Sequence, residues 1–171
     1  MIIFVFCEVM FFAGMISAHM ITRENAVDGV WPPPGSPMLP VVETGINTGF
    51  LFLSAFLLFL GHRAYGHNQQ RMYRYLLGAV AFGTLFVGLQ GREWAGLIEA
   101  GLTFTSSAHG SFFYFIVGTH ALHALCALGF MAYMLLLFRA GRLTATTFWA
   151  AEVFWYFVVG VWPIIYWQVY L

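Results

Sequence analysis

The chain has 171 residues, of which 61% are hydrophobic, 19% are aromatic and only 8% are charged. An average soluble domain has about 25% charged residues, so this composition excludes a soluble globular protein, which would have too few polar side chains for its surface. Seven basic residues balance seven acidic ones. The sequence has no basic patch of the kind that binds nucleic acid.

Five apolar runs follow one another along the chain, and each approaches or exceeds the roughly 20 residues that cross a bilayer as a helix. To within a few residues they cover 2–21, 44–62, 75–91, 110–138 and 147–170. The segments between them are too short for a separate domain. We therefore predict an all-α membrane bundle of five transmembrane helices, forming a single domain over residues 1–171.

All basic residues are arginines, and their placement predicts the topology. The loops after the second and fourth runs share one side of the membrane and carry Arg63, Arg71, Arg74, Arg139 and Arg142. The loops on the other side carry only Arg23 and Arg92. Because cytoplasmic loops are enriched in basic residues, we predict a cytoplasmic N-terminus and an external C-terminus.

The longest connection, residues 22–43, contains the run Trp31-Pro32-Pro33-Pro34. Proline fixes φ and removes backbone donors, so we predict an extended strap over the bundle. A solvated linker is the alternative, but Trp31 favours docking at the membrane surface. Trp94 lies at the end of the third run, and Glu43 can cap the second helix through its dipole. We expect these three side chains to contact lipid or a partner subunit.

Glu8 needs a specific explanation, because the run around it is otherwise apolar from Ile2 to Ile16. At 1.5 Å per residue it lies roughly 10 Å in from Met1, inside the hydrocarbon. An ionised carboxylate is costly there, so Glu8 is expected to be protonated or to face a polar partner inside the bundle. A carboxyl that only packs against a neighbouring helix is the alternative to one that exchanges protons.

His120 and His123 lie three residues apart in the fourth run and therefore share one helix face. We expect them to hydrogen-bond to acids or backbone groups inside the bundle. Haem held between two helices would need a histidine at matching depth on another run, and a metal site would need a carboxylate or thiolate at ligand spacing. His62 and His67 are assigned to a loop. No metal ligand set and no catalytic residue are predicted in this chain.

Two further acids lie at or inside the membrane. Glu93 follows Gln90 at the end of the third run, and Glu152 lies in the first turns of the fifth. Together with Glu8, His120 and His123, these two acids form the set of buried polar or proton-linked candidates.

Several short motifs follow one another along almost the whole chain, and each occurs once. They are Glu8-Val9-Met10-Phe11-Phe12-Ala13-Gly14, Trp31-Pro32-Pro33, Glu43-Thr44-Gly45-Ile46-Asn47-Thr48, Leu89-Gln90-Gly91-Arg92-Glu93-Trp94, Gly110-Ser111-Phe112-Phe113 and Gly118-Thr119-His120-Ala121-Leu122-His123. In this order, each on the expected helix, they resemble subunit III of the haem–copper oxidases of the cytochrome c oxidase type.

Two departures accompany the resemblance. The family's last helix usually reads Trp-His-Phe-Val-Asp, whereas this chain has Trp155-Tyr156-Phe157-Val158-Val159. A polar network there is altered, and Glu152 is a candidate to compensate. The chain also begins at the position of the family's third helix. In mitochondrial members the two preceding helices form a cleft that holds phospholipids, so a cleft closed on both sides is not expected here.

The resemblance implies a multi-pass subunit of a respiratory oxidase in a prokaryotic inner membrane. It implies that the chain carries no haem or copper of its own and packs against catalytic subunit I, in a complex with subunit II and other subunits. Haem and copper would belong to those partners. The implied roles of this subunit are to bind phospholipid and to support proton uptake, oxygen access and sustained activity.

Two other functions remain open at this point. A similar subunit of a nitric-oxide reductase or quinol oxidase is the nearest alternative, because the last helix diverges. A stand-alone proton channel or transporter would use Glu8, His120 and His123 as a relay. No broken helix or inverted repeat marks a substrate site for such a transporter.

Overall fold

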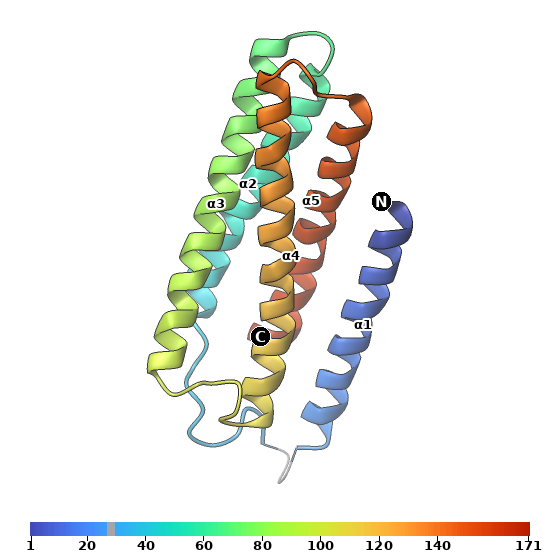
Figure 1. Ribbon diagram of the computed structural model, residues 1–171. Coiled ribbons are helices and arrows are strands. Elements are labelled where there is room, and N and C mark those ends of the chain that lie inside the picture. Colours follow the sequence, from blue (N-terminus) through green and yellow to red (C-terminus); the bar gives the residue numbers. More distant parts are fainter. Residues whose placement is uncertain (27–29) are drawn as a thin grey trace.

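The computed structural model describes residues 1–26 and 30–171, and within them it contains long helices and no strand (Figure 1). The helices are α1 (Ile2–Glu24), α2 (Val41–Ala64), α3 (Gln69–Glu99), α4 (Ala108–Arg139) and α5 (Ala145–Ile165), which continues as the π-helical turn η2 (Tyr166–Tyr170). Each of the five is long and apolar enough to span a membrane. The predicted all-α bundle of five spans is confirmed.

Most of the helices are longer than the apolar runs that predicted them, and α3 is the clearest case. The apolar run covers 75–91, whereas the helix extends from Gln69 to Glu99. The side chain of Asn68 caps its start by accepting a hydrogen bond of 2.9 Å from the backbone N–H of Arg71. An apolar run reports how much of a helix lies in hydrocarbon, and polar residues continue the helix on either side of it.

The centre of the bundle is α5, and α1 lies at its edge. In α5 and η2, 56% of the most apolar stretch is buried, against 17% in α1. α2 and α3 form an antiparallel pair, α5 packs on α2 and α4, and α1 packs mainly on α4 and α5. Trp155 and Trp162 of α5 are fully buried. Gly83 of α3 makes room for Trp155, because a Cβ at that position would lie 2.9 Å from the indole ring.

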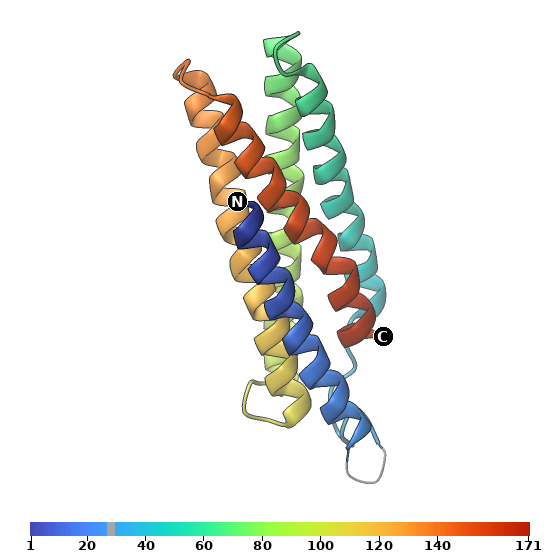
Figure 2. The same ribbon diagram turned by 90° about the vertical axis from the view of Figure 1, so that its right-hand side faces the viewer.

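α1 is displaced along the bundle relative to the other helices. Figures 1 and 2 show that its first residues lie well short of the end formed by the α2–α3 and α4–α5 connections. We call this the arginine-rich end, since Arg63, Arg71, Arg74, Arg139 and Arg142 lie in or near those connections. Only Phe12, Met15 and His19 of α1 are buried, so the helix contacts the bundle along one narrow stripe.

The opposite end, which we call the strap end, carries the described part of the long connection, residues 30–40, and the α3–α4 connection. The described strap forms no helix, but it is shorter than the predicted extended strap over 22–43, because α1 runs to Glu24 and α2 begins at Val41, and it contains a turn at Pro34 and Gly35. Trp31 lies against the rings of His19 and His109, with centroid distances of 5.6 Å and 5.3 Å. Leu39 packs against the core. The described strap therefore docks on the end of the bundle itself.

Candidate functional site

The structure brings Glu8 of α1 and His123 of α4 together. The His123 Nε2 atom lies 3.0 Å from the Glu8 Oε2 atom, and the two side chains are 14% and 20% exposed. His123 lies at the middle of α4. Because α1 is displaced along the bundle, Glu8 is at the same middle depth although it is close to the start of its own helix.

The contact made by the second ring nitrogen of His123, Nδ1, shows where the ring carries a proton. Nδ1 lies 2.8 Å from the backbone oxygen of Thr119. A carbonyl oxygen only accepts hydrogen bonds, so Nδ1 carries a proton and donates it. Nε2 then either accepts from a protonated Glu8 or, in the imidazolium form, donates to the carboxylate. A hydrogen bond across this 3.0 Å gap therefore needs one proton between Nε2 and Oε2, and with that proton the pair carries no net charge.

His120 shares the helix face of His123 but has different surroundings. It is 2% exposed and stacks on Trp162, with ring centroids 5.0 Å apart. Its Nε2 atom has no hydrogen-bond partner among the described residues. The expected bonding to an acid and to the backbone is therefore met by His123, whereas His120 packs among aromatic rings. Phe12 of α1 lies between the two, with its centroid 5.5 Å from His123 and 6.3 Å from His120.

Glu152 forms the second close contact between an acid and a histidine. Its Oε2 atom lies 2.7 Å from Nδ1 of His62, and the Glu152 residue is 7% exposed. His62 belongs to the last turn of α2 and not to a loop. The contact joins α2 to α5 near the arginine-rich end, beside the rings of Phe148 and Trp149.

Glu93 lies in a hydrogen-bonded network toward the strap end. Its Oε2 atom accepts from the Thr44 hydroxyl at 2.7 Å and from the Gln90 amide at 2.9 Å. Gln90 also lies 3.2 Å from the Tyr170 hydroxyl, and its Oε1 atom accepts from Asn47 at 3.3 Å. The network connects α2, α3 and η2, and it holds the Glu93 carboxyl group in a defined orientation.

The three predicted contact residues lie in different surroundings at the strap end. Trp31 is partly buried between α1 and α4, and Trp94 is partly buried against the core. Glu43 is exposed in the first turn of α2, where an acid favours the helix dipole, and it makes no capping hydrogen bond. Their contact with lipid or with a partner subunit stays a prediction.

Within residues 1–26 and 30–171, no three His, Cys, Asp or Glu side chains lie close enough together to hold a metal ion. Cys7 and Cys126 are free and exposed on the outside of the bundle. The described geometry offers a set of polar groups that link the helices.

The sequence singles out the acids but does not identify the partners of Glu152 and Glu93, namely His62, Thr44 and Gln90. The spacing of polar residues in the sequence indicates which residues of α2 face the bundle. Its buried residues are Thr44, Asn47, Leu51, Ser54, Leu58 and Gly61. These residues alternate in steps of three and four, so they form one helix face. Polar residues that recur on this face point into the bundle.

Comparison with known proteins gives a consistent result. The family model described as cytochrome c oxidase subunit III matches residues 1–171. The chain belongs to the cytochrome c oxidase subunit III family. It is 32% identical to the cytochrome c oxidase subunit 3 of Synechocystis sp., covering 99% of this chain and 73% of that protein. It is 31% identical to a probable cytochrome c oxidase subunit 3 of Nocardia farcinica, covering 94% and 80%.

The similarity extends to animals. The chain is 35% identical to cytochrome c oxidase subunit 3 of Strongylocentrotus purpuratus, covering 99% of this chain and 67% of that protein. Membership of this family places the chain in an oxidase complex that pumps protons. Its five helices make it a multi-pass membrane protein.

Proposed function

We propose that this chain is a non-catalytic subunit of a respiratory haem–copper terminal oxidase. In this proposal it packs against catalytic subunit I, in a complex with subunit II, in a prokaryotic inner membrane. It binds phospholipid and supports proton uptake and sustained activity during O2 reduction. Haem and copper are held by the partner subunits.

The observation that carries the proposal is the Glu8–His123 pair. A carboxyl group inside a membrane is costly unless it has a partner and a use. A proton shared between Glu8 Oε2 and His123 Nε2, which lie 3.0 Å apart at the middle of the bundle, would leave the pair without net charge, and this geometry supports a proton-linked role.

Purification through a tag on this chain tests the assembly. We expect the chain to purify with oxidase subunits and with a haem spectrum, and that spectrum also identifies the haem type. A chain that purifies without any haem protein would contradict the proposal.

Deletion of the chain tests the role. We expect haem content and initial turnover to be largely retained, while activity declines faster over successive turnovers than in a strain carrying the restored gene. Loss of the haem spectrum from an otherwise assembled subunit I would show that the chain is needed to build the redox site, contrary to the proposed supporting role.

A further inference from the structure

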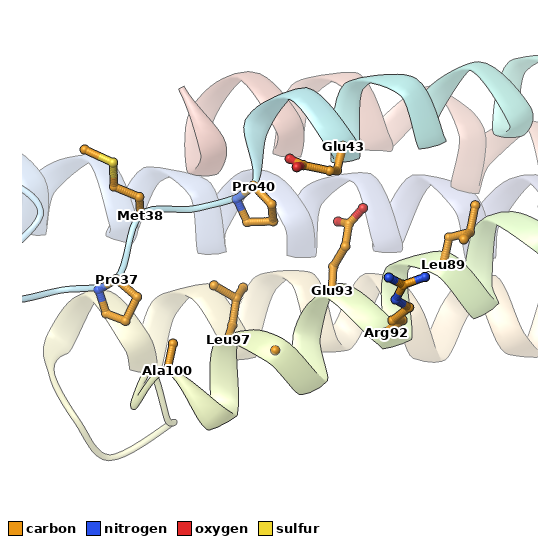
Figure 3. Close-up of a pocket in the computed structure, with 10 residues that line it drawn as sticks. Pro37, Met38, Pro40, Glu43, Leu89, Arg92, Glu93, Leu97 and Ala100 are labelled. Atoms are coloured by element: carbon orange, nitrogen blue, oxygen red, sulfur yellow. The ribbon is translucent and has the colours of Figure 1, made fainter.

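A cavity of about 440 Å³ lies between α2, α3 and the strap at the strap end (Figure 3). Most of its walls are apolar: Pro37, Met38, Pro40, Leu89, Gly96, Leu97 and Ala100. Its charged lining is Glu43, Arg92 and Glu93. The cavity therefore combines an apolar interior with two carboxyl groups and one guanidinium group.

The charged groups lie at the depth where hydrocarbon gives way to polar headgroups. Glu43 comes directly before the apolar run 44–62, and Arg92 and Glu93 come directly after the apolar run 75–91. Leu89 lies one turn further toward the middle of the membrane on α3. A molecule bound to the charged groups can therefore extend past Leu89 into the bilayer.

The carboxyl group of Glu93 is oriented before any ligand arrives. The Thr44 hydroxyl at 2.7 Å and the Gln90 amide at 2.9 Å both donate to its Oε2 atom. Figure 3 shows the Glu93 carboxyl group directed from α3 toward α2, the Glu43 carboxyl group lying along α2 on the side of Pro40, and the Arg92 guanidinium on the side of Leu89.

These charges are not neutralised inside the described part of the chain. The ion pairs found among residues 1–26 and 30–171 are His62–Glu152 and His123–Glu8, and neither involves the cavity. The cavity therefore presents two carboxyl groups and one guanidinium group that no ion pair within the described residues neutralises. A ligand that complements it needs a cationic group and an anionic group a short distance apart.

We propose that this cavity binds the headgroup of phosphatidylethanolamine, a zwitterionic phospholipid. The primary ammonium lies between Glu43 and Glu93, the phosphate contacts Arg92, and the acyl chains leave past Leu89. The proposal rests on the lipid-binding role proposed above and names the lipid class and the site.

Other occupants fit the lining less well. Phosphatidylglycerol has no cationic group and would place its phosphate beside two carboxylates. A quaternary choline ammonium has no N–H group to donate to those carboxylates. A divalent cation would share the cavity with the Arg92 guanidinium, which repels it. A basic side chain of a partner subunit is an outcome that the experiment must separate from lipid.

The test uses material purified through a tag on this chain and placed in nanodiscs with equal amounts of phosphatidylethanolamine and phosphatidylglycerol. In each sample one of the two lipids carries a photoactivatable group near the start of an acyl chain. Mass spectrometry then maps the label. We expect phosphatidylethanolamine to label peptides around Leu89 and Leu97 about fivefold more than phosphatidylglycerol, as for a partly exposed charge contact.

Single replacements test whether Glu43 and Arg92 cause the preference for phosphatidylethanolamine over phosphatidylglycerol. Glu43→Gln removes an exposed carboxylate that makes no hydrogen bond in the described structure, so folding should be unaffected. It should reduce the preference about fivefold. Arg92→Gln should lower labelling by both lipids. Glu99→Gln, at the exposed end of α3 and outside the cavity, is the matched control and should leave the preference unchanged.

Equal labelling by the two lipids, or the same effect of Glu43→Gln and Glu99→Gln, would overturn the proposal. So would absence of label from the cavity together with a cross-link from Glu43 or Glu93 to a partner subunit. Failure of the proposed function is recognised separately, as a tagged chain that purifies without haem protein. The lipid preference can still be measured on such material.

Discussion

The contact between Glu8 and His123 can be tested by replacing each residue alone and both together. Glu8→Ala leaves His123 Nε2 without its partner, and His123→Ala leaves the Glu8 carboxyl group without one. Shielded polar groups left unsatisfied cost about 1–3 kcal/mol each. The double replacement removes both groups, so it should cost less than the sum of the single ones.

The size of this coupling follows from the geometry. Hydrogen bonds between membrane helices contribute about 0.6 kcal/mol on average and about 1.7 kcal/mol at most. The contact is 3.0 Å long and its side chains are only 14% and 20% exposed. We therefore expect about 1 kcal/mol, or roughly a fivefold change in an equilibrium constant. The free energy of unfolding, titrated with SDS in mixed micelles, measures all four proteins of the cycle.

Glu8→Gln separates the proton from the hydrogen bond. The glutamine amide can still donate to Nε2, so stability should change by less than about 0.5 kcal/mol relative to the wild type. It has no carboxyl group, so a hydrophobic carbodiimide, which reacts with protonated carboxyls within the membrane, should no longer label position 8. In the wild type the label should appear at Glu8 ahead of Glu24 and Glu99.

Two results would refute this reasoning. A coupling energy near zero would mean that α1 is held without the polar contact. Label spread over Glu24 and Glu99, with Glu8 unmodified and Glu8→Gln behaving as wild type at every pH, would make Glu8 a packing residue. Asp28, a further acid for this comparison, lies outside the described residues.

Two further predictions concern packing and topology. Gly83→Ala places a Cβ 2.9 Å from Trp155, whereas Gly88→Ala on the same helix meets nothing within 4 Å. We expect Gly83→Ala to be less stable than Gly88→Ala by about 1–3 kcal/mol in the same SDS titration, and equal stability would contradict the close contact. A reporter fused after Leu171 should be active only outside the cell, because cytoplasmic loops are enriched in arginine; cytoplasmic activity would reverse the topology.

The number and type of helices could be predicted from the sequence because the bilayer imposes them. Each backbone group in hydrocarbon must be satisfied within its own helix, so a sufficiently long apolar run has one available structure. The ends of the helices could not be read in the same way. α3 continues well past its apolar run on both sides, because outside the hydrocarbon the helix is limited by capping and helix propensity, which the apolar run does not report.

The pairing of polar residues could be predicted only in part. The sequence predicts that Glu8 needs a partner, but His123 becomes that partner because α1 packs on α4 and is displaced along the bundle. The hydropathy pattern predicts that His62 lies in a loop, whereas it lies in the last turn of α2. That one turn places its ring beside Glu152. Partner choice depends on which helices touch and at what relative height, and hydropathy reports neither.

Each of the three membrane acids contacts a residue on another helix. Glu8 joins α1 to α4, Glu152 joins α5 to α2, and Glu93 joins α3 to α2. Hydrocarbon cannot satisfy a carboxyl group, and each of these acids has a hydrogen-bond partner on another helix. Replacing one member of such a contact leaves the other unsatisfied, whereas replacing both by apolar residues does not. A merely structural contact should therefore tolerate the double replacement. If the oxidase loses sustained activity when both Glu8 and His123 are replaced, and the bundle still folds, then the complex needs the exchangeable proton between these two residues.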